Sequence, residues 1–427
     1  MSKDTIVQGV DSDKKRSLLW LIFTAHRNSS FLPVLFTASI LIGLFFWGNS
    51  YLTNIYKTTL LQQVKESFSQ LVRTEAEKID LQLNQITDLT AFIQDDNTRF
   101  FLASESFPLP ADEPVFAVAS NGVMYKTIDN GGCSLFYSRL TKIGPAELKK
   151  SRETEVFDPL YRATVKNNPL IVAVYFNSFD HLNRYYPFIP DVVAQYDPDL
   201  RMQDYNFYYL ADAEHNPEKK PVWTGAYLDP AGLGWMVSCI APIYNRDFLE
   251  GVIGLDITIE VFVKNILNMH LPFNASAFLI DKNGMILAMS EKVEAYLGLK
   301  ELKEHVYSSQ IDKERLKPED YNLSRHPDGE LAKKFASMEK GNLPFIDVAR
   351  ENGEAIIFQH PIKETEWRLM IVVERKEIFV PVNAVEDTGR RLGYLVLLII
   401  IFSCAVFYLM ISSRSKAFAA SLSKPIV

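Results

Sequence analysis

Aromatic and acidic side chains gather in one part of the sequence, between residues 205 and 256. The segment Tyr205-Asn-Phe-Tyr-Tyr-Leu-Ala-Asp is followed by Pro-Val-Trp-Thr-Gly-Ala-Tyr-Leu-Asp and then by Gly-Val-Ile-Gly-Leu-Asp-Ile-Thr. A hydrophobic core favours aliphatic side chains over such a mixture. Aromatic faces beside single carboxylates attract cations, so this composition predicts a pocket for a small polar or amine-type ligand.

Each candidate residue of this pocket also has a purely structural explanation. Trp223 and Tyr227 would equally pack a loop onto a sheet, and Asp229 precedes Pro-Ala-Gly as turn-forming residues do. Asp256 lies in an apolar strand, where it would either accept backbone N–H bonds or contact a ligand. In an extended segment only one of two adjacent tyrosines faces inward. The candidates are Asn206, Tyr208, Tyr209, Trp223, Tyr227, Asp229 and Asp256.

The sequence shows no motif of a known catalytic or metal centre. It has no P-loop, no His-Glu-x-x-His and no Gly-x-Ser-x-Gly, and its 7 histidines are scattered. We therefore predict no catalytic residue, no metal and no cofactor. Outside the basic flanks of the two apolar segments described next, 37 basic and 49 acidic residues remain, and this net charge of −12 argues against nucleic acid and anionic lipid as partners.

Two apolar segments frame the region that would form the pocket. Residues 31–50 and 390–412 each reach the length of about 20 residues that spans a bilayer as a helix. Neither shows the polar stripe of a buried core helix. The first lies too far into the chain for a cleaved signal peptide. We expect two transmembrane helices, with residues 1–30 and 413–427 in the cytoplasm because basic residues outnumber acidic ones there.

The part between the spans is predicted to be α+β. Residues 51–100 place apolar side chains at threes and fours without Gly or Pro, which indicates one long stalk helix. Strand pairs joined by Asn-Gly turns then occur twice, in residues 101–272 and in residues 273–380. The charged stretch 292–339 is expected to be helical.

This order of elements resembles the double Cache family of extracytoplasmic sensor domains. Those domains belong to bacterial chemoreceptors, sensor histidine kinases and diguanylate cyclases. The resemblance rests on four segments. They are Asn-Pro-Leu-Ile-Val-Ala-Val-Tyr-Phe-Asn-Ser-Phe-Asp (168–180), residues 222–244, which begin with Val-Trp-Thr-Gly, residues 250–258 around Asp256, and Trp-Arg-Leu-Met-Ile-Val-Val (367–373). It covers about residues 52–411 and implies two PAS-like sheet units, a membrane-distal one (101–272) that binds ligand and a membrane-proximal one (273–380). It implies a bacterial inner membrane location with the sensor region outside.

The resemblance also suggests how the ligand would be held. In the family version that reads amino acids, a ligand lies under a loop, here residues 191–221, beside an arginine, Trp-Tyr, Tyr-x-Asp and a final Asp. These positions match Asn206, the Tyr208–Tyr209 pair, Tyr227 with Asp229, and Asp256. Because Asn206 replaces the arginine, a ligand carboxylate would lack a fixed partner. We therefore expect an amine or a neutral polar ligand rather than an α-amino acid. Arg201 lies nearby, but the sequence does not place it.

Further expectations concern assembly and the chain ends. Residues 413–427 resemble the opening of a HAMP linker that then stops, so we expect the input half of a receptor whose output type the sequence does not reveal. A homodimer along the stalk helix is expected to carry the signal. The alternative is an ectodomain that docks a periplasmic protein. A Cys133–Cys239 disulfide is left open.

Overall fold

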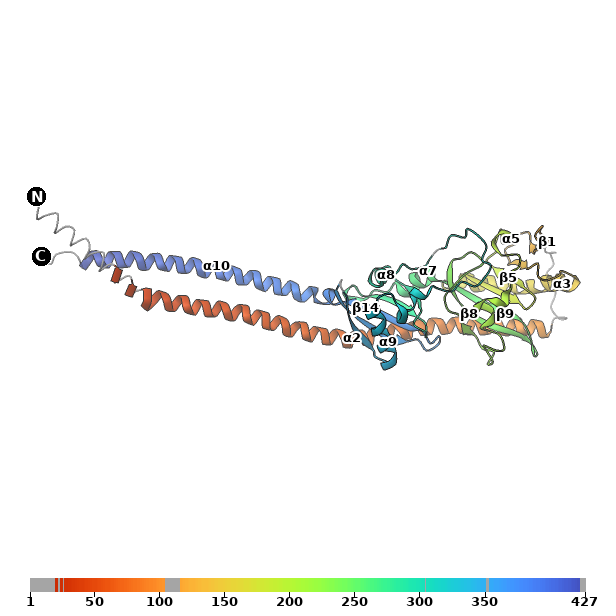
Figure 1. Cartoon of the computed structure of the whole chain (residues 1–427), viewed down its shortest axis with the longest axis horizontal. Helices are drawn as coiled ribbons and strands as arrows, with labels where there is room; N and C mark the ends of the chain where they lie inside the picture. Colours follow the sequence, from red (N-terminus) through yellow and green to blue (C-terminus); the bar gives the residue numbers. More distant parts are fainter. Residues whose placement is uncertain are drawn as a thin grey trace, which may run out of the picture. The chain divides into compact units, whose positions relative to one another are not determined.

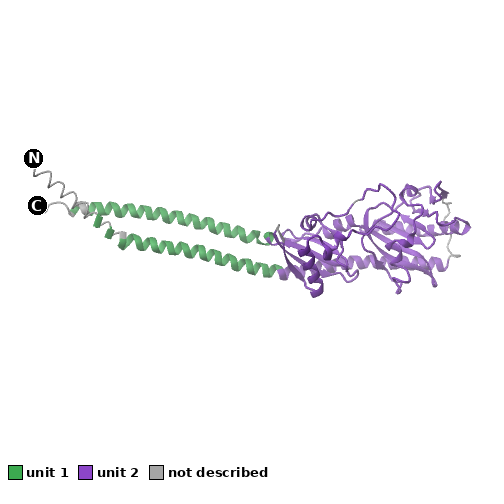
Figure 2. Cartoon of the chain, viewed as in Figure 1, with its two compact units in different colours: residues 1–64, 376–427 green, residues 65–375 purple. Residues whose placement is uncertain are grey.

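The computed structural model describes residues 20–21, 24–25, 27–103, 116–303, 305–350 and 353–422 (Figure 1). The chain divides into two compact units (Figure 2). One comprises residues 65–375, and the other comprises residues 1–64 together with 376–427. Most of the predicted N-terminal segment 1–30 lies outside the described residues, and so do residues 423–427 of the HAMP-like segment.

The unit that contains both chain ends is built from two antiparallel helices. A π-helical turn, η1 (Arg27–Phe31), leads into α2 (Leu32–Leu102), and α10 (Arg375–Leu422) returns alongside its first part. The ring of Phe46 lies 5.7 Å from that of Tyr394. Both helices contain stretches long and apolar enough to cross a membrane.

Within residues 65–375, α2 packs along both sheets of the sensor region. Phe68 stacks on Phe358 of the second sheet with 5.2 Å between ring centroids. Nineteen positions later on the helix, the Thr87 hydroxyl accepts a bond of 3.0 Å from Trp223 Nε1 of the first sheet. The buried face recurs at threes and fours, which confirms the predicted amphipathic helix. Its members include Phe68, Val72, Ala76, Ile79, Leu83, Ile86 and Ile93.

The first sheet is antiparallel, with strand order β1-β2-β3-β5-β4-β9-β8-β6 and with β7 paired to β8. One face of β4 and β5 is covered by the helices that precede β4. The strands are β1 (Phe116–Val118), β2 (Met124–Lys126), β3 (Ser134–Tyr137), β4 (Ala173–Ser178), β5 (Leu182–Tyr186), β6 (Val222–Trp223), β7 (Tyr227–Leu228), β8 (Trp235–Asn245) and β9 (Phe248–Thr258). The covering helices are α3 (Pro145–Glu153), η3 (Thr154–Phe157) and α4 (Asp158–Asn167).

Short helices connect the parts of this region. The loop between β5 and β6 contains α5 (Val192–Gln195), η4 (Met202–Asp204) and α6 (Asn206–Tyr209). After β9 the chain passes through α7 (Ile259–Phe262), η5 (Val263–Leu267) and η6 (Pro272–Asn274) to the second sheet.

The second sheet is also antiparallel, in the order β11-β10-β14-β13-β12. Leu331, Phe335 and Met338 of α9 pack into the same core as Phe278 and Ile357 of this sheet. Together the two sheets confirm the predicted α+β fold. The strands are β10 (Ser276–Ile280), β11 (Ile286–Met289), β12 (Phe345–Arg350), β13 (Gly353–Pro361) and β14 (Arg368–Glu374), with helices α8 (Glu291–Leu297), η7 (Glu319–Tyr321), η8 (Leu323–Arg325) and α9 (Gly329–Gly341).

The expected helix over residues 292–339 is wrong in its middle. Helix α8 ends at Gly298, whose φ of +71° is the left-handed conformation that glycine adopts most easily. The α-helix resumes only at α9, where Asp328 caps the first turn. Between them lie mainly irregular backbone and the short turns η7 and η8. Part of this backbone pairs with the first sheet, which the charge pattern of the segment did not reveal.

Candidate functional site

The side chains of one face of the first sheet form the floor of a cavity. Residues two apart in a strand share a face, so Tyr175 and Asn177 of β4 lie on the same side as their cross-strand partners Tyr185 and Asn183 of β5. On the other side of β4, Tyr175 pairs with Gly254 of β9. A Cβ on Gly254 would lie 2.0 Å from Tyr175 Cζ, so the glycine makes room for the tyrosine ring.

The loop between β5 and β6 closes the cavity from above. Helix α6 directs Phe207 to the floor, where its ring centroid lies 5.9 Å from that of Tyr175 and 5.5 Å from that of Tyr227. The full lining consists of Tyr175, Asn177, Asn183, Tyr185, Tyr196, Leu200, Met202, Phe207, Tyr227, Asp229, Pro230 and Asp256.

The cavity is narrow. About 290 Å³ of space lies between the surrounding atoms, part of it open to solvent, but the centre of a water molecule can move through only about 20 Å³. That is room for about one water. A larger guest therefore requires the side chains of the loop, such as Leu200 and Met202, to move outward.

Asp256 lies at the bottom of this cavity, on β9. Its Oδ1 accepts a bond of 2.6 Å from Ser238 Oγ of the neighbouring strand β8. The Tyr227 hydroxyl is 2.7 Å from the same Ser238 oxygen and 3.5 Å from the carboxylate. Burial raises the pKa of Asp256 well above its ordinary value, and the charge of Asp229 raises it further.

Asp229 begins the tight turn that follows β7. Its carboxylate accepts backbone N–H bonds of 2.9 Å from Ala231 and 3.0 Å from Leu233. Burial raises the pKa of Asp229 to about 6, although these two N–H bonds favour the ionised form. Asp229 is therefore both the turn former that its sequence context indicated and a residue of the cavity wall.

The charged side chains of the described cavity lining are all acidic. The lining contains two acidic side chains and, among the residues that the structure describes, no Lys, Arg or His. Three further polar atoms at the cavity wall, Asn183 Oδ1 and the hydroxyl oxygens of Tyr175 and Tyr185, are buried without a hydrogen-bond partner in the described part of the chain. Unpaired buried polar atoms cost free energy. The cavity thus offers hydrogen-bonding groups and negative charge to a guest.

The structure brings three of the predicted site residues together and separates the others. Tyr227, Asp229 and Asp256 line the cavity. Asn206, Tyr209 and Trp223 line a different, wider groove, and Tyr208 is buried outside both. Residues 206–209 form helix α6 rather than an extended segment, so Phe207 is the one that reaches the cavity. The assignment of all these residues to ligand binding stays a prediction.

Several lining residues were not predicted although the sequence carries a signal for them. In β4 and β5, aromatic and amide side chains alternate with the residues of the opposite face: Tyr175 and Asn177, then Asn183 and Tyr185. This period of two indicates one shared face. Tyr196 and Met202 carry no comparable signal, because they reach the cavity through an irregular loop.

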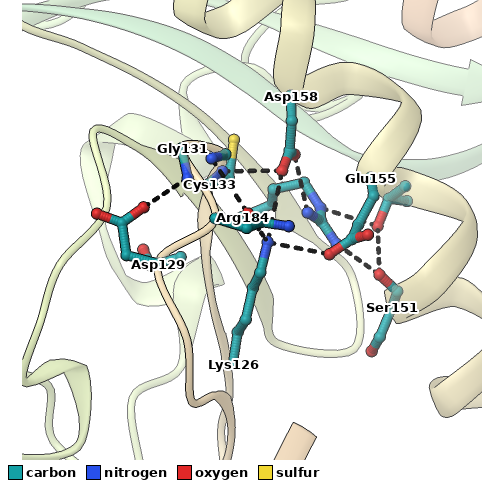
Figure 3. Close-up of polar contacts among 12 residues, drawn as sticks. Lys126, Asp129, Gly131, Cys133, Ser151, Glu155, Asp158 and Arg184 are labelled. Carbon is teal, nitrogen blue, oxygen red and sulfur yellow. Dashed lines mark hydrogen bonds and ion pairs between the residues drawn. The ribbon is translucent and has the colours of Figure 1, made fainter. Parts of the chain in front are cut away.

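A second cluster of charges lies on the opposite face of β5 (Figure 3). Arg184 Nη1 contacts Asp158 Oδ1 at 2.9 Å, and Lys126 Nζ contacts Glu155 Oε1 at 3.0 Å. A Cβ on Gly132 would lie 2.3 Å from Asp158 Oδ2, which shows how tightly the loop is packed. Because the buried cations face buried anions at close range, this cluster joins β2 and β5 to the covering helices rather than offering a site to a ligand.

The cysteines do not form the disulfide that the sequence left open. Cys133 and Cys239 are both free and buried. Cys133 lies in the charged cluster, where its backbone N–H donates to Asp158 Oδ2 at 2.8 Å. Cys239 lies in β8, with its Sγ 3.9 Å from the Thr87 hydroxyl.

Comparison with known proteins decides the family. The Cache domain family dCache_1 matches residues 53–382. The chain belongs to this family. Membership confirms the sequence-based recognition of a double Cache sensor region and its function as a sensor for small molecules. A search of curated proteins found no match.

Solved structures similar to this Cache region include chemoreceptor ligand-binding domains and the extracellular domain of a putative histidine kinase. The domain of the Pseudomonas aeruginosa amino acid chemoreceptor PctB in complex with L-Arg is 14% identical, with 75% of this chain and 98% of that one covered and a TM-score of 0.45. The domain of Pseudomonas fluorescens CtaA with L-alanine is 15% identical (74% and 99% covered, TM-score 0.45). That of Campylobacter jejuni Tlp3 with L-norvaline is 14% identical (77% and 97% covered, TM-score 0.43).

Proposed function

We propose that this Cache region senses a small cationic amine, which binds in the cavity walled by Tyr227, Asp229 and Asp256. The observation that supports the proposal is the pair of buried carboxyls without a basic partner in the described lining. An ammonium group placed between them would favour their ionised forms and offset the cost of burying them. Aromatic rings such as those of Tyr175 and Phe207 would add cation–π attraction.

The same geometry disfavours a ligand with a carboxylate. Asn206, at the position of the family's arginine, lines the other groove, and its Nδ2 lies 3.4 Å from the Gly225 carbonyl oxygen. A ligand carboxylate in the cavity would meet Asp229 and Asp256 and would pay for its own desolvation. An α-amino acid is therefore excluded from the proposal.

We propose the bacterial inner membrane as the location, with both chain ends in the cytoplasm and residues 65–375 outside. The two apolar helices support this, and so do Arg27, Arg414 and Lys416, which flank the apolar stretches on one side. The proposed signal is a displacement by the ligand of the loop that covers the cavity, followed by a shift of α10. A change in populations from 1:99 to 99:1 takes about 5.5 kcal/mol of differential binding.

A homodimer that packs along α2 is part of the proposal. Leu81 and Phe92 are 67% and 59% exposed on this helix. Eleven residues correspond to about three helical turns, so the two side chains lie on one face. A second copy would cover them.

The test is a thermal-shift and calorimetry series on the full chain in detergent with ethylamine, putrescine, L-alanine and butyrate. An amine at 100 times its Kd adds about 2.7 kcal/mol to the stability of the folded state. We expect an amine to raise the melting temperature. L-alanine and butyrate should leave the melting temperature unchanged. If L-alanine stabilises the chain instead, the amine proposal is wrong. If no small molecule stabilises it and a purified periplasmic protein does, the docking alternative replaces the sensor pocket.

A further inference from the structure

The segment Tyr307–Lys317 of the second sheet unit lies against the walls of the cavity in the first unit. It belongs to the irregular connection between α8 and η7. The Tyr307 hydroxyl donates to the Asp229 carbonyl oxygen at 2.6 Å and accepts from the Gly234 N–H at 3.0 Å. It therefore closes the turn whose N–H groups hold the Asp229 carboxylate.

The same segment extends the first sheet beyond β7. The Leu228 N–H donates to the Arg315 carbonyl oxygen at 2.9 Å, and the Lys317 N–H donates to the Ala226 carbonyl oxygen at 3.3 Å. Tyr227 and Leu316 form an antiparallel bridge between these two bonds. The strand that carries the cavity residue Tyr227 is thus paired with β8 on one side and with this segment on the other.

The loop over the cavity contacts the segment as well. Glu314 Oε1 accepts from the Asn206 N–H at 2.6 Å, at the first residue of the helix that carries Phe207. The Gln310 side chain donates to the Ala194 carbonyl oxygen at 2.9 Å. Tyr196, a cavity residue, forms a parallel bridge with Ile311. The elements that carry Tyr196, Phe207, Tyr227 and Asp229 therefore all bond to this one segment.

At its end the segment is fixed to the second sheet. Lys317 Nζ lies 2.6 Å from Glu301 Oε1 and donates to the Leu287 carbonyl oxygen at 3.0 Å. Glu301 Oε2 in turn accepts from the Met289 N–H at 2.6 Å. Leu287 and Met289 belong to β11, the edge strand of that sheet. Lys317 therefore joins the two sheets directly, because its backbone bonds to the first and its buried side chain to the second.

We infer that Tyr307–Lys317 positions the carboxylate turn and the loop of the cavity, and that it transmits changes in the cavity to β11 through Lys317 and Glu301. This inference rests on the proposed function for the identity of the ligand site. The buried pair of Lys317 and Glu301 is tightly packed against β11, whereas solvated side chains would move freely. A displacement of β7 therefore shifts Lys317 and, through this pair, β11.

The experiment follows amide hydrogen exchange in the full chain in lipid nanodiscs by mass spectrometry. The cavity is perturbed by ethylamine and, without any ligand, by Gly254→Ala, which displaces the Tyr175 ring, or by the nearly isosteric Asp256→Asn. We expect each perturbation to change the exchange rates at residues 307–317 and at Ile286–Met289 by about two- to tenfold. This is the change that the gain or loss of one hydrogen bond would cause.

The double variant Glu301→Gln/Lys317→Met tests the link to β11. It replaces both partners of the buried pair, which folds tolerate better than the loss of one, and it keeps the backbone bond to Ala226. We expect the response at Ile286–Met289 to disappear and the response at residues 307–317 to remain. Lys313→Met, an exposed lysine on the same segment, is the control and should respond as the native chain does.

Tyr307→Phe tests the positioning role separately. Loss of the hydroxyl removes both of its hydrogen bonds to the turn, so exchange of the turn amides 231–234 should speed up at least about two- to tenfold, the effect of losing one hydrogen bond. Unchanged exchange there would overturn this part.

The proposed transmission is wrong if the double variant leaves the exchange response of β11 unaltered. It is also wrong if neither Gly254→Ala nor Asp256→Asn changes the exchange of β11 in a chain that keeps Glu301 and Lys317. If ethylamine fails to bind while the cavity variants still act on β11, the proposed function fails and this inference stands.

Discussion

Asp229 and Asp256 line one cavity without a basic side chain in its described lining, and the charge of Asp229 contributes to the raised pKa of Asp256. Both carboxyls are buried, and this burial is the main reason why the pKa of each is raised. The empty site therefore favours protonated acids, whereas a cationic guest favours ionised ones. This opposition determines the sign of the first three predictions.

Asp256→Asn should lower the affinity for the amine that the binding series identifies, because the substitution removes a buried charge that the ligand would pair with. The loss of a buried charged hydrogen-bond partner corresponds to about 2–5 kcal/mol. Isothermal titration calorimetry measures the change. Asp247→Asn, in the exposed turn between β8 and β9, is the matched control and should bind as the native chain does. Native affinity in Asp256→Asn would refute the assigned site.

Amine affinity should fall as the pH drops below about 6, the pKa of Asp229 in the empty site. The amine pairs with the ionised carboxyl, so protonation competes with binding, by about tenfold per pH unit for one group. Calorimetry between pH 5 and 8 would show this slope. A flat profile would mean that the ligand does not require the ionised acids.

The empty chain should lose stability as the pH rises through about 6. A carboxyl whose pKa is higher in the folded than in the unfolded state contributes stability that is complete below the unfolded value and lost above the folded one. For Asp229 these values are 3.8 and about 6. Melting temperatures measured from pH 4 to 8 should therefore fall less in Asp229→Asn than in the native chain. Parallel curves would show that the carboxyl is not desolvated.

Gly254→Ala should disturb the cavity without straining the backbone. The added Cβ would lie 2.0 Å from Tyr175 Cζ, so the ring must move. Overpacking of this kind costs about 1–3 kcal/mol, and the displaced ring should also reduce amine affinity. Gly225→Ala is the control, since a Cβ there meets no atom within 4 Å. Equal melting temperatures and affinities for the two variants would contradict the close packing of Tyr175 on β9.

Arg184→Met should destabilise the fold far more than Arg139→Met. Arg184 is fully buried, and its loss removes the cation that contacts the Asp158 carboxylate at 2.9 Å, which costs about 3–5 kcal/mol. Arg139 pairs with Asp199 at the surface, where such pairs contribute about 0–1 kcal/mol. Thermal melting of both variants provides the comparison. Similar melting temperatures would argue that the charged cluster on the back of β5 is not structural.

The sequence by itself determined the long helix α2, the strand pairs of the two sheets and the family. A repeat of threes and fours is enough to form α2, and a repeat of two is enough to place Tyr175 and Asn177 on one face, because both patterns follow from local backbone geometry. Tyr227, Asp229 and Asp256 were predicted as site residues from their aromatic and acidic types and from the resemblance to the double Cache family, and all three line the cavity.

Only the tertiary structure decided which of the aromatic residues meet those acids. Phe207 rather than Tyr208 or Tyr209 reaches the cavity because residues 206–209 curl into a helical turn. The contact of Tyr307 with Asp229 joins residues 78 positions apart and has no local signature. Sequence periodicity reports which face of an element is buried. Which element buries that face depends on packing between segments that are distant in sequence. Packing of this kind is why residues 307–317 link the two sheets instead of forming the expected helix.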